Sequence, residues 1–291
     1  MSEVLEFGSD GWLLDGQPWE PSGHFYGVMG DPIGHSRSPA IQTVALAERE
    51  IDADYLPIRI SAGQLTQLKK SEAGQLLVGF NATAPLKEAV SALCDGRTDQ
   101  ARSLGAVNTV KVEDGKWLGH NTDSGGILSV LSQAWVGEEL PARAVVLGAG
   151  GSARAAVDAV ARWGISSIEV RNRSAAGQDR FRTWAESQDY GDRIKVGGLQ
   201  SDREPVSDVP AVWICCLAGG VPSSPFLPDA AGSGGALLLD LRYGDQLPDD
   251  SAPLGFQFTD GKPVLLMQGG LSFTWWFGPP VPWLAMREAL G

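Results

Sequence analysis

The pattern of apolar and polar positions predicts that short strands and helices alternate along the first third of the chain. The runs with strand character cover residues 25–29, 54–60 and 76–81, and the segments with helical periodicity cover residues 39–49, 63–70 and 87–94. Such order is typical of a mainly parallel sheet with helices on its faces, and ligands of such sheets bind outside the carboxyl ends of the strands. The loops at residues 30–38 and 81–87 are therefore candidate binding loops.

A second stretch of alternation begins after a hairpin predicted at residues 107–119, around Glu113-Asp114-Gly115. Its predicted elements are a helix at 123–132, a strand at 144–147, a helix that ends at 163 and strands at 168–171, 212–216 and 237–241. This order contains a βαβ unit. An apolar helix is predicted at 268–277, before three prolines that interrupt it at positions 279, 280 and 282.

The remaining segments receive no chemical role. Residues 1–24 read as a polar strand-and-turn pair around Asp15-Gly16, a tight-turn signal, and residues 201–210 and 244–252 read as loops. A chain of 291 residues fits two domains. The whole pattern predicts an α/β protein whose first domain has a mainly parallel sheet and whose second is of the Rossmann type.

Composition narrows the classes of partner. The chain has 35 acidic and 23 basic residues and a net charge of −12, which disfavours a nucleic-acid partner. Its three cysteines, two of them adjacent, are a poor basis for disulfides and favour a reducing compartment. Residues 1–24 lack a signal-peptide pattern, and no apolar run approaches the ~20 residues that span a bilayer. We therefore expect a cytoplasmic protein without a membrane partner, and we predict no metal site.

A glycine-rich turn after the strand at 144–147 predicts a dinucleotide site. The turn opens a helix with a G-x-G-x-x-A pattern, whose candidate cofactor residues are Gly148, Gly150, Gly151, Ser152 and Ala153. The glycines permit a tight turn and close approach to a pyrophosphate, and the amino end of the helix favours phosphate. The alternative interpretation is a turn with a purely structural role.

The tip of the next strand indicates which cofactor is bound. NAD-binding proteins carry an acidic residue there, whereas this chain has Asn172-Arg173-Ser174, followed by Arg180. Arg173 and Arg180 could hold the 2′-phosphate of NADP(H). Alternatively, Arg173 is a solvated loop arginine.

Two charged residues are candidates for proton transfer. Lys87 is predicted at the first turn of a helix, where the helix dipole disfavours a cation, so a surface lysine gains nothing there. Asp123 opens the helix at 123–132 and could orient the proton of Lys87, although the alternative reading of Asn121-Thr122-Asp123 as a helix N-cap is equally good. Reduction of a ketone by hydride needs such a proton donor.

The loop Gly34-His35-Ser36-Arg37-Ser38-Pro39 is a candidate carboxylate receptor, because it offers two hydroxyls and several backbone N–H groups near a helix start. Ser38, before Pro39, is predicted to be the N-cap of that helix. The N-cap role would account for Ser38 without a bound ligand. It would not account for Ser36.

Several ungapped stretches together resemble the shikimate dehydrogenase family. They are GVMGDPIGHSRSP, NATAPLK, GAVNT at residues 105–109, GHNTD at 119–123, GAGGSAR, NRS and the Gln268-Gly269 pair. They follow in order between about residue 25 and residue 278, and several motifs in order are far more specific than one.

The resemblance implies a function and a set of site residues. It implies NADPH-dependent, reversible reduction of 3-dehydroshikimate, with Lys87 and Asp123 as the catalytic pair. It implies that Ser36 and Ser38 hold the substrate carboxylate with Tyr243 nearby, and that the substrate hydroxyls are bound by Thr83, Asn108 and Gln268. It also implies a substrate-binding domain at 1–122 plus 263–291, an NADP-binding Rossmann domain at 123–262, and a monomer or homodimer.

The chain departs from the family pattern mainly at the nicotinamide end. Ile214-Cys215-Cys216-Leu217 stands where family members usually have an Asn-Ala-Thr or Asn-Ala-Ser element. Val264, Ser124 and Ala82 stand where a Met, a Gly and a Val are frequent. Alternatives are therefore an enzyme of the same fold acting on quinate or aminoshikimate, or a catalytically silent shikimate-binding relative.

Overall fold

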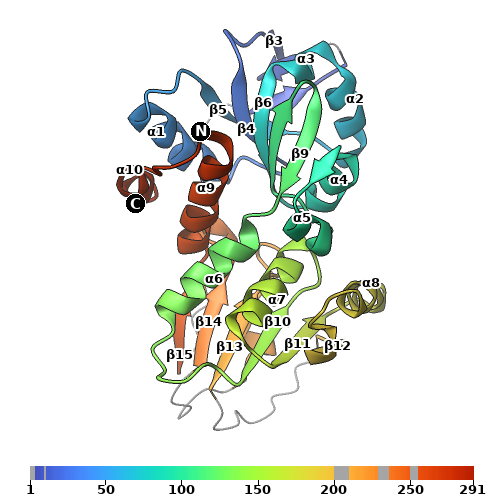
Figure 1. The fold of residues 1–291 in the computed structure, drawn as a ribbon, viewed down its shortest axis with the longest axis vertical. Helices are drawn as coiled ribbons and strands as arrows, with labels where there is room; N and C mark the ends of the chain where they lie inside the picture. Colours follow the sequence, from blue (N-terminus) through green and yellow to red (C-terminus); the bar gives the residue numbers. More distant parts are fainter. Residues whose placement is uncertain (1–3, 10, 200–209, 229–235, 250–254) are drawn as a thin grey trace. The chain divides into compact units, whose positions relative to one another are not determined.

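The computed structural model describes residues 4–9, 11–199, 210–228, 236–249 and 255–291. It divides into two compact units, Met1–Thr122 with Gln268–Gly291 and Asp123–Met267. Each unit has its own β-sheet (Figure 1). Most of the predicted loop at 201–210 and the end of that at 244–252 lie outside the described residues.

Within the described residues, the sheet of the first unit has nine strands in the order β3-β2-β1-β5-β4-β6-β8-β9-β7. In chain order the strands are β1 (Leu5–Phe7), β2 (Trp12–Leu14), β3 (Gln17–Trp19), β4 (Phe25–Gly30), β5 (Asp54–Arg59), β6 (Leu77–Ala82), β7 (Gly96–Arg97), β8 (Thr109–Glu113) and β9 (Lys116–His120). The strands β1, β5, β4 and β6 run parallel to one another, and antiparallel hairpins flank them, so the sheet is mixed.

The helices of the first unit cover both faces of this sheet. They are α1 (Ser38–Glu48), α2 (Leu65–Lys70), α3 (Glu72–Gln75), α4 (Lys87–Leu93), α5 (Asp99–Leu104), α10 (Trp283–Glu288) and the end of α9 (Lys262–Phe277). Along β4 the side chains alternate: Phe25 and Met29 join the core under α2 and α4, whereas Tyr26 contacts Trp276 of α9. A six-residue strand that alternates in this way is buried on both faces.

The predicted strand-and-turn pair around Asp15-Gly16 is the hairpin of β2 and β3, but the amino-terminal segment is part of the core of the first unit, so its predicted polar character is wrong. β1 adds to the sheet in parallel beside β5, and β2 and β3 follow as an antiparallel meander. Trp12 is 3% exposed, packs edge-on against Phe7 and Phe25, and donates a hydrogen bond from Nε1 to the carbonyl of Ala73. Three-residue strands are too short for the alternating pattern to reveal such burial.

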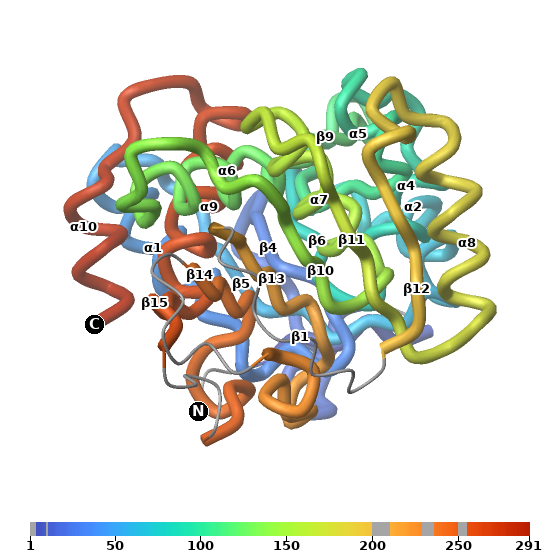
Figure 2. The backbone as a smooth tube through the Cα atoms, turned by 90° about the horizontal axis from the view of Figure 1, so that it is seen from below, coloured from blue at the N-terminus to red at the C-terminus, as the bar shows by residue number. Residues whose placement is uncertain are grey.

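Within the described part of the second unit, six strands form an all-parallel sheet in the order β12-β11-β10-β13-β14-β15. The strands are β10 (Arg143–Leu147), β11 (Ser167–Asn172), β12 (Ile194–Gly198), β13 (Ala211–Cys215), β14 (Ala236–Asp240) and β15 (Phe256–Thr259), and Figure 2 shows β15 and β12 at opposite edges. This order is that of a Rossmann domain, with its switch point between β10 and β13. The predicted fold class is thereby confirmed.

Three helices of the second unit are α6 (Asp123–Ala134), α7 (Gly151–Trp163) and α8 (Ala175–Glu186), and α6 and α7 pack side by side (Figure 1). The sequence pattern missed α8, β12 and β15 of this unit and β1, α3, β7, α5 and α10 of the first, and α9 begins at residue 262 rather than at 268. Helix α8 has an exposed, charged outer face, and β12 ends in two glycines, so neither carries a strong apolar period. No helix in the described ranges combines the length and apolarity needed to cross a membrane.

Candidate active site

Two candidate binding loops start at the same edge of the first sheet. Strands β4 and β6 are parallel neighbours with Met29 opposite Ala82, so the loops that follow them leave side by side. The backbone N–H of Thr83 donates to the carbonyl of Met29 at 2.9 Å, which ties the second loop to the end of β4. This is the edge of the sheet at which ligands are expected to bind.

Ser36 and Ser38 lie where the first of these loops enters α1, but their structural roles differ from the prediction. Helix α1 begins at Ser38 itself, the residue before it is Arg37, and no side chain caps it there. Instead, the backbone N–H of Ser38 donates to Oγ of Ser36 at 3.3 Å, the type of local bond that serine hydroxyls make two residues away. The N-cap prediction for Ser38 is therefore wrong. The hydroxyl oxygen of Ser36 accepts a hydrogen bond from the backbone N–H of the first helical residue.

Lys87 is the first residue of α4 and is half-buried. The preceding residue, Leu86, is completely buried, and the carbonyl of Lys87 accepts a hydrogen bond from the backbone of Val107 at 3.0 Å. The sequence thus holds the backbone of Lys87 on both sides while it places an ammonium group at the dipole end that disfavours it.

Asn108, which precedes β8, and Thr122, which follows β9, join Gln268 of α9 in one hydrogen-bond network. Nδ2 of Asn108 donates to Oγ1 of Thr122 at 2.9 Å and to Oε1 of Gln268 at 3.2 Å. Oδ1 of Asn108 accepts from the backbone N–H of Thr122 at 2.8 Å. The carbonyl of Asn108 accepts from the backbone of Ala82 at 2.9 Å, which links the network to the Thr83 loop.

The structure therefore brings four predicted site residues of the first unit into one neighbourhood: Thr83, Lys87, Asn108 and Gln268. The residues that reasoning from the sequence missed in the same network are Asn81, Thr109 and Ser272, all buried. Asn81 and Thr109 lie inside the family motifs NATAPLK and GAVNT, and this position could have identified them as site residues. Ser272 lies in none of these motifs, so its sequence position does not indicate its role.

Asp123 directly follows Thr122 and is the first residue of α6. The residue before the helix is Thr122, so the alternative reading of Asn121-Thr122-Asp123 as a helix N-cap stays open, and a carboxylate in the first turn also suits the helix dipole. The next residue, Ser124, donates a hydrogen bond to the buried carboxylate of Asp158 on α7. Lys87 belongs to the first unit and Asp123 to the second, and their pairing stays a prediction.

The glycine turn after β10 has the geometry that a dinucleotide requires. Gly148 has a φ of +116°, and a Cβ atom there would lie 2.9 Å from the carbonyl oxygen of Cys216 on the neighbouring strand end. Gly150 precedes α7, and no atom of the described residues lies within 4 Å of the place where its Cβ would be. Open space in front of backbone N–H groups at a helix start is a cradle for a pyrophosphate.

The rest of the glycine motif packs the turn against the sheet. Gly151 is the first residue of α7, followed by Ser152, and Ala153 is completely buried. The turn lies at the switch point of the sheet, where Leu147 pairs with Cys215. The residues present fit a dinucleotide cofactor.

At the tip of β11, the turn itself uses two of the three residues predicted to select the cofactor. Ser174 is the N-cap of α8 and accepts from the backbone of Gly177 at 3.2 Å. The side-chain amide of Asn172 donates to the carbonyl of Ser174 at 3.2 Å. Arg173 and Arg180 are exposed, and the tip Asn172-Arg173-Ser174 holds no carboxylate. This arrangement leaves two guanidinium groups accessible to a phosphate.

The departures at Cys215 and Cys216 have different structural consequences. Cys215 is completely buried, Nη2 of Arg242 donates to its Sγ at 3.4 Å, and burial raises the pKa of the thiol to about 12. Arg242 in turn forms a buried ion pair with Asp240 at 2.6 Å, next to the half-buried Tyr243. Cys215 therefore faces the protein interior, whereas half-buried Cys216 lies beside Gly148.

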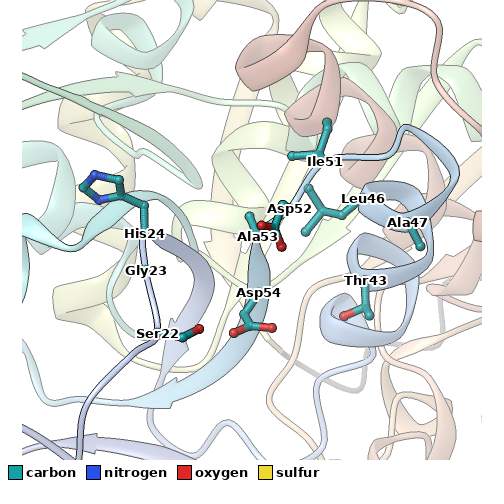
Figure 3. Close-up of a pocket in the computed structure, with 10 residues that line it drawn as sticks. All are labelled: Ser22, Gly23, His24, Thr43, Leu46, Ala47, Ile51, Asp52, Ala53 and Asp54. Atoms are coloured by element: carbon teal, nitrogen blue, oxygen red, sulfur yellow. The ribbon is translucent and has the colours of Figure 1, made fainter.

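A pocket of about 410 Å³ lies away from these residues (Figure 3). It is lined by the chain before β4, including His24, by α1, and by the turn before β5, including Asp52. These segments lie at the amino ends of parallel strands, so the pocket is at the edge opposite the candidate loops. Its position does not match that of a ligand site in such a sheet.

Comparisons with known proteins agree with this geometry. A sequence model described as the shikimate dehydrogenase substrate binding domain matches residues 28–110. Shikimate dehydrogenase (NADP(+)) of Anaeromyxobacter sp. (strain K) is 32% identical over 267 residues, which cover 91% of this chain and 95% of that protein. The chain belongs to the shikimate dehydrogenase family. The resemblance predicted from the motifs is thereby confirmed.

Solved structures of the shikimate dehydrogenase fold are also similar to the chain. Shikimate 5-dehydrogenase from Thermus thermophilus, in complex with NADP(H) and shikimate, has a TM-score of 0.69 and 28% identity, and the match covers 91% of this chain and 98% of that one. Ligand-free 5-ketofructose reductase of Gluconobacter sp. strain CHM43 has a TM-score of 0.73 and 26% identity, with 92% and 98% covered. The fold thus serves more than one named activity.

His120, which precedes the Asn121-Thr122-Asp123 stretch, gives a prediction for pH. Oγ1 of Thr98 caps α5 by accepting from the backbone N–H of Ala101, and it also lies 3.0 Å from Nδ1 of His120. The His120 ring stacks on Trp275 at 4.7 Å, and burial lowers the pKa of His120. The folded protein therefore disfavours protonation of His120.

We expect the free energy of unfolding to fall as the pH drops below about 6.5, because the unfolded chain then binds a proton that folded His120 resists. His120→Phe keeps a ring beside Trp275 but cannot titrate. Its free energy of unfolding, measured by urea denaturation, should be lower at pH 7 and should change less between pH 7 and pH 5. Equal changes in the wild type and the variant would contradict this role of His120.

Proposed function

We propose that this chain is a shikimate dehydrogenase that uses NADP(H) to interconvert 3-dehydroshikimate and shikimate, a reaction of aromatic amino-acid biosynthesis. The observation that carries the proposal is the buried network of Asn108, Thr122 and Gln268 at the edge of the sheet that also bears Thr83 and Lys87. Amide and hydroxyl groups in fixed positions recognise the hydroxyls of a polyol and disfavour analogues that lack them. The names of the relatives support the same substrate and cofactor.

In the proposed reaction, Lys87 is the acid–base residue. When bound, NADPH supplies the hydride that reduces the ketone carbon. The ammonium group of Lys87 gives a proton to the ketone oxygen, so the ketone gains one hydride and one proton and becomes a hydroxyl. In this proposal the carboxylate of Asp123 orients the ammonium group of Lys87. In the reverse direction, neutral Lys87 removes the hydroxyl proton.

The substrate is proposed to bind to the first unit. Ser36 and Ser38 would hold the carboxylate, with Tyr243 of the second unit on the same side of the substrate. Thr83, Asn108 and Gln268 would bind the hydroxyls. The loops that carry Ser36 and Thr83 leave the sheet side by side, which supports this assignment. Residues 1–122 plus 263–291 would thus form the substrate domain.

The cofactor is proposed to bind to the second unit, in an NADP-binding domain formed by residues 123–262. Gly148, Gly150, Gly151, Ser152 and Ala153 would form the pyrophosphate cradle, and Asn172, Arg173, Ser174 and Arg180 would surround the 2′-phosphate. The open space at Gly150 and the exposed arginines support the assignment. We further propose a cytoplasmic protein that works as a monomer or homodimer.

The main rival is a related activity on another polyol, such as quinate or aminoshikimate. The similarity to a structure named 5-ketofructose reductase supports a related enzyme with another polyol-like substrate as a second candidate. The silent, shikimate-binding alternative rested partly on Cys215, and that thiol is buried against Arg242, so its substitution removes no surface group. Steady-state turnover of shikimate and quinate, each with NADP⁺ and NAD⁺, separates the three.

Lys87→Ala is expected to lower kcat with shikimate by ~10²-fold or more, the scale of lost acid–base catalysis, and to change shikimate affinity only a few fold. Lys116→Ala, an exposed lysine on β9, is the matched control and should retain wild-type kcat. Steady-state kinetics and calorimetric titration of shikimate measure both quantities. Near-normal turnover of Lys87→Ala would remove Lys87 from the mechanism.

Cofactor binding is expected to protect one thiol from alkylation. Half-buried Cys216 adjoins Gly148, whereas half-buried Cys94 belongs to the other unit. NADP⁺ should therefore slow the reaction of Cys216 with iodoacetamide and leave that of Cys94 unchanged, as measured for each cysteine by peptide mass spectrometry. Better protection by NAD⁺ than by NADP⁺ would overturn the proposed cofactor preference, and protection of neither thiol would contradict the proposed cradle.

A further inference from the structure

Ser272 contacts four other residues of the buried network, and sequence motifs give it no role. It lies on α9 one turn after Gln268 and is completely buried. Its hydroxyl donates to the carbonyl of Gln268 at 3.0 Å. Its oxygen also lies 3.0 Å from Nδ2 of Asn81, 2.8 Å from Oγ1 of Thr109 and 3.1 Å from Oγ1 of Thr122.

The available protons fix the direction of two of these hydrogen bonds. A carbonyl oxygen can only accept, so the hydroxyl of Ser272 donates to the main chain of α9. The Ser272 oxygen accepts from Nδ2 of Asn81, whereas in its contacts with Thr109 and Thr122 either hydroxyl could be the donor. Removal of the Ser272 hydroxyl would leave a buried N–H group of Asn81 without this bond, so the network constrains its members.

Tyr55 fixes the far end of this network. Its hydroxyl donates to Oδ1 of Asn81 at 2.6 Å, and burial raises the pKa of Tyr55 well above its ordinary value, so the phenol keeps its proton. With Oδ1 of Asn81 bound to Tyr55, Nδ2 must face Ser272. The amide orientation of Asn81 is thus set from both sides.

The near end of the network is the side chain of Gln268. Nδ2 of Asn108 and Oγ1 of Thr122 lie 3.2 and 3.4 Å from Oε1 of Gln268. Oε1 therefore points into the network, and the amide nitrogen is the end that can donate to a substrate oxygen. The bond from Ser272 to the carbonyl of Gln268 holds the same residue by its backbone.

We propose that Ser272 is a positioning residue for substrate recognition, which holds the side chains of Gln268 and Asn108 in the orientations in which they meet the substrate. The inference rests on the proposed function, because it assumes that Gln268 and Asn108 bind the substrate. Ser272 acts through these residues and does not itself touch the substrate.

A purely structural reading of Ser272 is that it only satisfies a helix carbonyl. Thr274 on the same helix provides the matched control, since its hydroxyl donates to the carbonyl of Gly270 at 3.0 Å, also four residues back, but the residue is exposed. Ser272→Ala and Thr274→Ala therefore remove the same type of local bond. Only the first removes an acceptor from the network.

The test measures KM and kcat of both variants for shikimate and NADP⁺, together with shikimate binding by calorimetry without cofactor. Ser272→Ala should raise KM and Kd for shikimate by about tenfold, the scale of one buried hydrogen bond, and leave KM for NADP⁺ within about twofold. Thr274→Ala should change kcat, the two KM values and the Kd for shikimate by no more than about twofold. Tyr55→Phe, which removes only one hydroxyl, should raise KM for shikimate in the same direction and keeps the inference testable if Ser272→Ala fails to fold.

The positioning role would be overturned if the KM for shikimate is unchanged in Ser272→Ala or Tyr55→Phe, or if the KM values for shikimate and NADP⁺ rise equally. Normal turnover of shikimate by the wild-type enzyme would still support the proposed function in that case. A wild-type protein that neither binds nor oxidises shikimate would overturn the proposed function and the inference with it.

Discussion

The first unit depends on the requirement that buried polar groups find hydrogen-bond partners. Asn81, Asn108, Thr109, Thr122 and Ser272 are all removed from solvent, and each bonds to others in the set. An unpaired buried polar group costs about 1–3 kcal/mol, so these residues stabilise the sheet only when β6, β8, β9 and α9 are all in place. The same constraint that holds the elements together fixes the amides that are proposed to meet the substrate.

The second unit depends on a different constraint, the close approach of two strand ends at the switch point of its sheet. A side chain at position 148 would meet the backbone of Cys216, and a left-handed φ disfavours other residues as well. The buried Asp240–Arg242 pair lies at the same edge of the sheet, and Arg242 also donates to the carbonyl of Ala218 at 3.2 Å in the loop after β13. Together these contacts leave the amino end of α7 open in front of the turn.

What could be predicted from the sequence is local chemistry, and what could not is contact between distant segments. Asp15-Gly16 and Asp114-Gly115 both have the positive φ angles of two-residue hairpin turns, as their residue types predict. The glycine turn before α7 could likewise be predicted from its G-x-G-x-x-A pattern. Asn81 and Ser272 are 191 positions apart and Trp12 and Ala73 are 61 apart, and no local pattern reports such pairs. Even at short range, α1 begins one residue earlier than predicted, so Ser38 is its first residue rather than its N-cap, and Ser36 accepts from the backbone N–H of Ser38.

The account of the first unit is tested most directly by a crystal structure of the protein with shikimate and NADP⁺. We expect the amide nitrogen of Gln268 to donate to a shikimate hydroxyl while its amide oxygen stays bonded to Thr122 and Asn108. Shikimate bound to other residues, or Gln268 turned away from Thr122 in the complex, would contradict the account.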